Sequence, residues 1–206
     1  MAMRKTLSLI MMLFPVMALA QPAAVDLGLS VKWAACNLGA DAPEASGEYY
    51  AWAEAAPKQE YSWDSYAWGR DTWESLTKYN AGFRLGYLME KEDDAAAAAL
   101  GAGWRIPTDP EWRELLSECD WTWCSQGGVN GYKVSSRSGG ASIFLPAAGY
   151  KDERGLVHEG TDGRYWSATR HPYHPVCAMN LFFNSDHRYQ YFYRRYRGYS
   201  IRPVCD

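Results

Sequence analysis

Residues 164–204 read RYWSATRHPYHPVCAMNLFFNSDHRYQYFYRRYRGYSIRPV. In this segment short apolar stretches alternate with Tyr, Arg, His, Asn and Ser, which is typical of strands with one buried face. The pattern predicts four strands, over Tyr165–Thr169, Met179–Phe183, Arg188–Tyr193 and Tyr199–Val204. The chain is therefore expected to end in a meander of short strands, and this meander decides the fold class.

Two helices are predicted upstream of the meander. The first covers Asp93–Leu100, where an aspartate cap precedes a run of alanines with high helix propensity. The second begins at Thr108, which forms a capping box with Glu111. Its apolar stripe consists of Trp112, Leu115, Leu116 and Cys119. Two helices followed by a meander indicate an α+β domain.

The remaining segments predict further strands and one long loop. Val25–Cys36 alternates around apolar residues, and Glu48–Trp52 has high β propensity, so each is expected to be a strand. Residues 53–84 are aromatic but irregular, which indicates a long loop that packs its own rings onto the core. Tyr132–Ser135 and Ser142–Leu145 flank the turn sequence RSGG and predict a hairpin, and a polar loop is expected after residue 150.

The first twenty residues have the pattern of a signal peptide. Arg4 and Lys5 give a basic start, Leu7–Val16 is an apolar run, and Ala18-Leu19-Ala20 fits a signal-peptidase site. The apolar run is short for a membrane span, although an uncleaved anchor is the alternative. We therefore predict an exported protein with residues 1–20 removed, no membrane span after cleavage, and residues 21–206 folded as a single domain.

Charge is unevenly distributed along the chain. Removal of residues 1–20 takes the formal net charge from −3 to −5, because this segment contains two cations and no acid. Seven arginines against Asp186 give residues 164–202 a net charge of +6, which leaves −11 for the rest of the mature chain. A basic aromatic tract on an acidic body could attract an anionic ligand. Alternatively, the arginines stack on tyrosines and pair with acids of the body.

The cysteine pattern leaves the redox state open. An exported protein can form disulfides, but an odd number leaves at least one thiol free or paired between chains. Cys119 and Cys124 are expected at a helix end and in the loop that follows it. Buried, reduced thiols are equally compatible with the sequence, and connectivity stays open. The five cysteines are Cys36, Cys119, Cys124, Cys177 and Cys205.

A set of ordered motifs carries a family resemblance. The motifs are VDLGLSVKWAACNLGA (25–40), GWRIPTDPEW (103–112), NGYKV (130–134), SIFLPAAGY (142–150), RYWSA (164–168), LFFNS (181–185) and GYSIRPV (198–204). Together they resemble the Fibrobacter succinogenes major paralogous domain family of exported bacterial proteins, over nearly all of the mature chain. WRIPTDPEW with a terminal G-x-S-I-R-P-V is more distantly similar to the C-type-lectin-like fold of diversity-generating-retroelement variable proteins and formylglycine-generating (sulfatase-modifying) enzymes. The resemblance implies a compact α+β domain with two main helices, mostly antiparallel short strands, long loops on one face and paired terminal strands.

The resemblance also implies where a ligand would bind. The variable proteins bind through residues just before the terminal R-P-V, and tyrosines there give rigid contact area at a small entropic cost. The matching positions are Arg170, His171, Tyr173, His174, Asn180, Asp186, His187, Arg188, Tyr189, Tyr191, Tyr193 and Tyr196. A half-buried strand face is the alternative for the tyrosines. The resemblance places Trp166, Phe182, Ile201 and Val204 in the core instead.

The sequence gives little support to a catalytic or metal site. His171, His174 and His187 could share a metal ion, but rigid prolines and the lack of a nearby carboxylate other than Asp186 favour solvated or stacking imidazoles. The Asp and Glu pairs near residues 93 and 109 are explained by helix capping. The motifs of calcium-dependent lectins do not occur. We therefore expect no catalytic residue, no cofactor and no metal.

The sequence thus predicts an exported, non-catalytic, adhesion-type domain that binds a surface protein or glycan. We expect a monomer, and no nucleic-acid binding because the body is acidic. One alternative is a sulfatase-modifying type of enzyme in which Cys177 or Cys205 is redox-active. Another is a structural subunit of a surface assembly.

Overall fold

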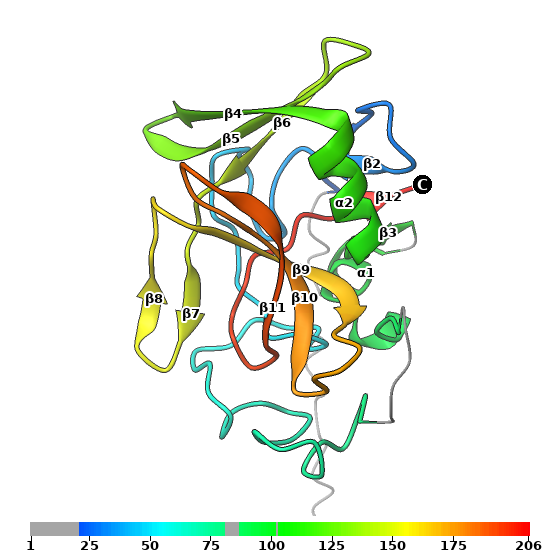
Figure 1. Cartoon of the computed structure of the whole chain (residues 1–206), viewed down its shortest axis with the longest axis vertical. Coiled ribbons are helices and arrows are strands. Elements are labelled where there is room, and N and C mark those ends of the chain that lie inside the picture. Colours follow the sequence, from blue (N-terminus) through cyan, green and yellow to red (C-terminus); the bar gives the residue numbers. More distant parts are fainter. Residues whose placement is uncertain (1–20, 81–86, 102) are drawn as a thin grey trace, which may run out of the picture.

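Small antiparallel sheets and two α-helices make up the described part of the protein (Figure 1). The computed structural model describes residues 21–80, 87–101 and 103–206. Every pair of named strands in these ranges is antiparallel, which confirms the predicted α+β class. The predicted signal peptide, residues 1–20, lies outside the described residues.

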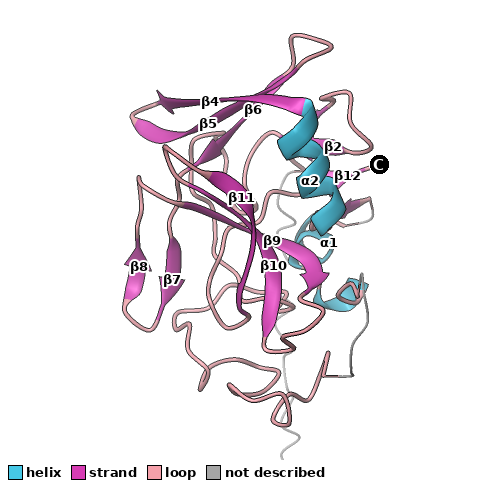
Figure 2. Cartoon of the chain, in the orientation of Figure 1, coloured by secondary structure: helices cyan, strands magenta, loops and turns pink. Residues whose placement is uncertain are grey.

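Both predicted helices are present (Figure 2). Helix α1 covers Ala95–Leu100, and the Asp94 carboxylate caps it by accepting hydrogen bonds from two backbone amides, at 2.9 and 3.0 Å. A 3-10 turn (η1, Lys91–Asp93) precedes it, so the helix begins two residues later than predicted. Helix α2 covers Asp109–Glu118 and has the predicted capping box between Thr108 and Glu111.

The first sheet joins the two ends of the domain. Its order is β1-β2-β12-β3, and Trp33 on β2 pairs with Val204 on β12, so the implied pairing of the terminal strands is confirmed. The expected strands Val25–Cys36 and Tyr199–Val204 are wrong as continuous strands. Gly28 turns the chain at a φ of +76°, and Tyr199 forms only an isolated bridge, to Tyr50. The strands are β1 (Ala24–Val25), β2 (Lys32–Ala34), β3 (Trp104–Arg105) and β12 (Val204–Cys205).

The second sheet contains most of the meander. Its strands are β9 (Gly163–Arg170), β10 (Cys177–Phe183) and β11 (Arg188–Arg194), in the order β11-β10-β9. Three of the four strands predicted from residues 164–204 are therefore confirmed. Asn180 in the central strand faces Tyr191 on β11 and Trp166 on β9. Strand β11 forms one edge of this sheet.

Two further sheets contain one hairpin that the sequence predicted and two elements that it did not predict. The expected hairpin is present as β5 (Val129–Ser136) and β6 (Ser142–Pro146). The third strand of that sheet, β4 (Cys119–Gln126), was not predicted, so Cys124 lies in a strand and not in a loop. The polar segment after residue 150 also forms a hairpin, of β7 (Tyr150–Asp152) and β8 (Gly155–Val157).

The expected strand Glu48–Trp52 is wrong, because only Tyr50 pairs there, in an isolated bridge.

Aromatic side chains fill the core. The ring centroids of Trp33 and Trp112 lie 4.7 Å apart, and Trp166 stacks on Tyr199 at 4.2 Å. The expected core positions at Trp112, Trp166, Ile201 and Val204 are all buried. The expectation for Phe182 is wrong, because its side chain is half-buried and the neighbouring Phe183 packs in the core instead.

The long aromatic segment behaves as predicted over its described part. Residues 53–80 contain no helix or strand, and residues 81–84 lie outside the described residues. The Tyr66 hydroxyl donates to the Trp52 carbonyl at 3.0 Å, and the indole nitrogen of Trp68 donates to the Ala53 carbonyl at 2.7 Å. Side-chain hydrogen bonds to backbone carbonyls therefore hold this loop on the core.

No helix within residues 21–80, 87–101 and 103–206 combines the length and apolar character that a membrane crossing demands.

Candidate functional site

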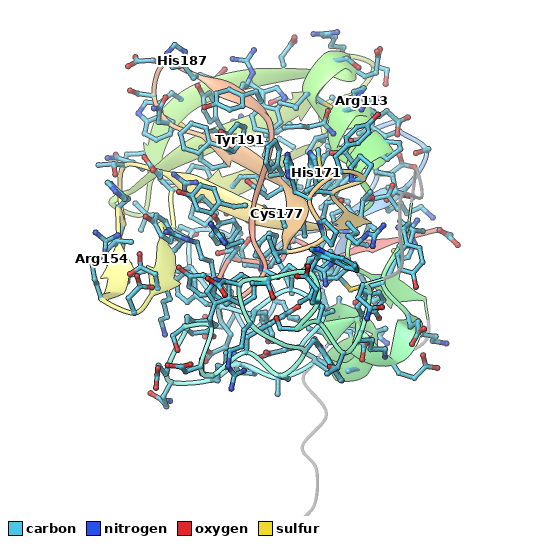
Figure 3. All side chains as sticks on the ribbon, turned by 60° about the horizontal axis from the view of Figure 1, so that its bottom comes forward. Arg113, Arg154, His171, Cys177, His187 and Tyr191 are labelled. Atoms are coloured by element: carbon cyan, nitrogen blue, oxygen red, sulfur yellow. The ribbon has the colours of Figure 1, made fainter. Side chains whose placement is uncertain are left out.

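The exposed residues of β11 and of the two loops beside it form one surface. We call it the β11 surface, and it consists of Tyr173, His174, Asp186, His187, Arg188, Tyr189, Tyr191 and Arg194. Tyr189 and Tyr191 are 45% and 44% exposed, although each is a large aromatic residue in a regular strand. In Figure 3, Tyr191 and His171 lie on the side turned towards the viewer, and His187 lies at the far end of this surface. Exposed tyrosines on a strand give contact area with little freedom to lose.

Ring contacts hold these side chains in place. The Tyr191 ring stacks on Phe192, with centroids 5.1 Å apart, and meets the Tyr189 ring edge-on at 5.9 Å. Tyr189 in turn contacts Phe182 across the sheet at 5.1 Å. The exposed rings are therefore members of a connected aromatic row and not isolated side chains.

The loop between β9 and β10 is organised around His171. Its Nδ1 atom accepts hydrogen bonds from the backbone amides of Tyr173 (3.2 Å) and His174 (3.0 Å). Burial, followed by the nearby His174 and Arg170, lowers the pKa of His171 to about 4. The imidazole is therefore neutral at neutral pH and can act as this acceptor. Its ring also packs on Phe192, with centroids 4.0 Å apart, which joins the loop to β11.

Two shallow depressions flank the row of rings. The larger, of about 770 Å³, is lined by Leu116, Asp186, His187, Arg188, Tyr189 and Gln190. The smaller, of about 380 Å³, is lined by His174, Val176, Cys177, Tyr191, Phe192, Tyr193 and Arg194. Each depression thus combines at least one tyrosine with one exposed arginine. Neither encloses a small molecule, so the geometry suits contact with a larger partner.

Three predicted contact residues lie in the interior. Arg170 is buried, and its guanidinium donates to the Tyr79 carbonyl at 2.9 Å. Asn180 is fully buried in the central strand, and Tyr196 is buried against Trp63, with ring centroids 5.0 Å apart. Their assignment to a surface contact is wrong, since no ligand reaches them without unpacking the domain. Two other candidates are covered in part. His171 is mostly buried, and Tyr193 is half-buried.

The structure also corrects the expected basic patch. Arg195 and Arg202 are fully buried and donate to backbone carbonyls. Arg164 and Arg197 pair with carboxylates of the body, at 3.3 and 3.5 Å, and stack on Tyr150 and Tyr193. For Arg164 and Arg197 the alternative of stacking on tyrosines and pairing with acids is confirmed, whereas Arg195 and Arg202 are held by backbone carbonyls instead. The formal charge of +6 therefore does not reach the surface as one patch.

Only two arginines of residues 164–204 are exposed, Arg188 and Arg194. Arg188 lies over the rings of Trp121 and Tyr132, at 5.9 and 5.8 Å. Neither guanidinium forms an ion pair with a carboxylate of the described residues. Both charges are therefore available to a partner at the two ends of β11.

The sequence-based prediction overlooked three residues of this site. Arg194, Phe192 and Gln190 line the depressions but were not among the predicted contacts. The signal was present in the sequence RYQYFYR, where an arginine stands at each end of a run of alternating aromatic residues. Only the sheet register shows that this run is one edge strand.

The geometry gives little support to a redox-active cysteine. All five thiols are unpaired, which answers the question that the sequence left open. Burial raises the pKa of the thiols of Cys36, Cys119 and Cys177, and this favours the less reactive protonated form. At Cys177 burial outweighs the charges of Arg194 and Arg195, which favour the thiolate, so the pKa of this thiol is raised on balance.

The histidines do not converge on a metal site. His171 and His174 stack on each other, with ring centroids 4.8 Å apart, while His187 lies in the turn that precedes β11. Within the described ranges, no group of three His, Cys, Asp or Glu side chains is placed to hold a metal ion.

A separate apolar cleft of about 510 Å³ lies beside α1 and β3. Two of its charged members, Asp94 and Arg105, already have partners within the protein. The Asp94 carboxylate caps α1, and Arg105 makes a bidentate ion pair with Glu111, at 2.8 and 2.6 Å. The cleft therefore offers less to orient a ligand than the β11 surface does.

Comparison with known proteins identified no matching family model, no matching curated protein and no matching solved structure. The fold and the site together define an α+β domain that presents aromatic residues and two arginines on an edge strand. Function is therefore argued from this surface.

Proposed function

We propose that this chain is an exported, non-catalytic binding domain that recognises a surface protein or a glycan through the β11 surface. The observation that carries the proposal is the pair of exposed tyrosines, Tyr189 and Tyr191, on a regular strand. Burying the rings of such residues is a main source of affinity at protein interfaces. The same flat rings can stack on the apolar face of a sugar.

Rigidity of the surface supports this proposal. The ladder with β10 holds the backbone of β11, and contacts with Phe182 and Phe192 hold the rings of Tyr189 and Tyr191. A side chain that is ordered before binding loses less conformational entropy on binding. Folding therefore already fixes much of the conformation of these two side chains, before a partner binds.

We also propose that the fold is C-type-lectin-like and that the protein acts as a monomer. The pairing of β2 with β12 and the long loop over residues 53–80 support the assignment of the fold. The proposed export rests on the sequence of residues 1–20. The burial of Cys177, which raises the pKa of its thiol, favours a binding role over an enzyme in which this cysteine is redox-active.

The proposal is tested by screening the purified protein against an array of glycans and surface proteins. The Tyr189→Ala/Tyr191→Ala double variant should lose the partners that the unchanged protein binds, because both rings leave the contact. Trp73→Ala is the matched control, since Trp73 is also an exposed aromatic residue (59%) but lies in the loop over residues 53–80. Undiminished binding by a folded double variant would refute the assignment of the site.

A further inference from the structure

The outer side of β11 is an unpaired backbone edge. Two hydrogen bonds bracket its ladder with β10, from Asn184 N to His187 O (2.9 Å) and from Arg195 N to Val176 O (3.1 Å). In an antiparallel pair, hydrogen-bonded positions alternate with non-bonded ones. Tyr189, Tyr191 and Tyr193 therefore bond inward to β10.

By the same alternation, the backbone amides and carbonyls of β11 at positions 188, 190, 192 and 194 point away from β10. Among the described residues, no strand pairs with this side of β11. One of the outward groups is already used, because the Arg194 carbonyl accepts from Arg197 N at 3.3 Å. The backbone groups of Gln190 and Phe192 remain at the centre of the edge.

This edge is fixed in position by helix α2. The Gln190 side chain donates to the Asp109 carbonyl at 2.5 Å and accepts from Arg113 Nε at 3.2 Å. Phe192 packs against His171. Because both central residues are held by other elements, the edge is a preformed template for another strand.

The ends of the edge carry like charges. Arg188 and Arg194 are six residues apart, which corresponds to about 20 Å along a strand. Natural edge strands often carry charges that prevent uncontrolled pairing. If two copies of this chain paired antiparallel along the whole of β11, each Arg188 would face Arg194 of the second copy. That arrangement brings two pairs of like charges together and disfavours self-association through this edge.

The same two charges favour a different partner. An acidic side chain opposite each arginine would convert the repulsion into two cross-strand ion pairs. Between them, the rings of Tyr189, Tyr191 and Phe192 offer apolar contact to alternate side chains of an added strand. An edge strand with such contacts can bind an extended peptide by strand addition, in which backbone hydrogen bonds give affinity and side chains give specificity.

We propose that β11 binds an extended acidic peptide segment as an added antiparallel strand, with carboxylates near Arg188 and Arg194. This inference rests on the proposed function and names the class of partner that the β11 surface takes. The peptide backbone pairs with Gln190 and Phe192, and the two arginines select peptides with acids six residues apart.

Synthetic peptides test this proposal on the purified full chain. The probe has Glu at two positions six residues apart, with alternating Thr and Val between them, and the control peptide has Lys at both positions. We expect the Glu peptide to bind about tenfold more tightly, because oppositely charged pairs replace repulsive ones. A third peptide, with Pro at two central positions, cannot complete the backbone ladder and should not bind.

Charge reversal in the protein provides the decisive comparison. The Arg188→Glu/Arg194→Glu variant should prefer the Lys peptide, whereas Arg70→Glu, at an exposed arginine outside β11, should keep the preference for Glu. Equal binding of the Glu and Lys peptides, or an unchanged preference in the double variant, would overturn the proposal. So would binding of alginate, an acidic polysaccharide, that depends on both arginines while no peptide binds.

The outcome also separates this inference from the proposed function. If array partners require Tyr189 and Tyr191 but none of the peptides binds, the binding domain stands and strand addition is wrong. If neither peptides nor array partners bind, both proposals fail. Circular dichroism and the thermal midpoint confirm in each case that the variants are folded.

Discussion

The buried arginines and the exposed arginines of residues 164–204 have opposite roles. Arg195 and Arg202 are fully buried; Arg195 donates to a carbonyl of the loop over residues 53–80, and Arg202 donates to carbonyls of β2 and β6. Arg188 and Arg194 are exposed on one strand and form no ion pair with the described residues. The same residue type thus serves both the interior and the surface, and only the position of each arginine in the fold distinguishes its role.

The buried arginines can join several elements because a guanidinium has several N–H donors in one plane. Arg202 donates to the Ala34 carbonyl (3.0 Å), the Phe144 carbonyl (2.7 Å) and the Asn37 side chain (3.0 Å). Burial lowers its pKa, since the charged form loses hydration. These hydrogen bonds join the first sheet, the following turn and β6 around the C-terminal strand.

The largest effect is expected from Arg202→Met. This change leaves buried acceptors at Ala34, Asn37 and Phe144 without their donor, and should lower the free energy of unfolding by about 3–5 kcal/mol. Urea denaturation measures it. Arg194→Met is the matched control and should change stability by less than about 0.5 kcal/mol, because its side chain is exposed. Similar losses for the two variants would break the distinction between interior and surface arginines.

The tyrosines of β11 extend the comparison to one strand. The Tyr193 ring lies 4.4 Å from the Arg197 guanidinium and is half-buried, whereas Tyr191 is exposed. We expect Tyr193→Ala to destabilise by about 2 kcal/mol, through lost burial and cation–π contact. Tyr191→Ala should destabilise by only about 0.5 kcal/mol. Thermal unfolding of both variants checks this order, and an equal loss would mean that Tyr191 belongs to the packing and not to a binding surface.

His171 provides a test by pH. Its pKa is about 4 in the folded protein and 6.5 without burial. As pH falls below 6.5, the unfolded imidazole takes up a proton that the folded one does not, so stability falls until pH reaches about 4. We expect this residue to account for a loss of about 3 kcal/mol over that range, at about 1.4 kcal/mol per unit of pKa difference.

The control for His171 is His171→Asn, whose side-chain oxygen can still accept from the loop amides. The variant should lose the part of the pH dependence that His171 causes, as measured by denaturation at a series of pH values. Parallel pH curves for the unchanged protein and His171→Asn would show that the loop does not depend on a neutral imidazole.

Local patterns in the sequence were sufficient for the elements with strong local signals. The capping box at Thr108 and the alternating strand around Tyr189 depend on neighbours within a few residues, and both are confirmed. Strand β4 was missed although Trp121 and Trp123 alternate correctly, because the helix prediction at Cys119 left the following residues unassigned. Short segments such as Tyr199–Val204 depend on distant partners that a local pattern does not contain.

The β11 surface shows the same limit. The sequence does not distinguish a buried arginine from an exposed one. The guanidinium of Arg202 donates to the carbonyls of residues 34 and 144, whereas the guanidinium of Arg194 is exposed to solvent. Burial at Arg170 and Asn180 follows from long-range packing, so a sequence-based list included them with the exposed residues. The alternation in RYQYFYR contained enough information to place its tyrosines on one side, but not to show that the strand lies at an edge.

The smallest effect on stability is expected from Arg188→Ala combined with Arg194→Ala. Both side chains are exposed and form no ion pair with the described residues, and the contact of Arg188 with Trp121 and Tyr132 is long, so the free energy of unfolding should change by less than about 0.5 kcal/mol. Removing the two like charges also removes the repulsion between paired copies of β11, so the double variant should associate at high concentration where the unchanged protein stays monomeric. Sedimentation velocity over a series of concentrations measures this. If the variant is instead monomeric and as soluble as the unchanged protein, the arginines do not protect the edge. Their only remaining role would then be contact with a partner, which the charge-reversal experiment tests directly.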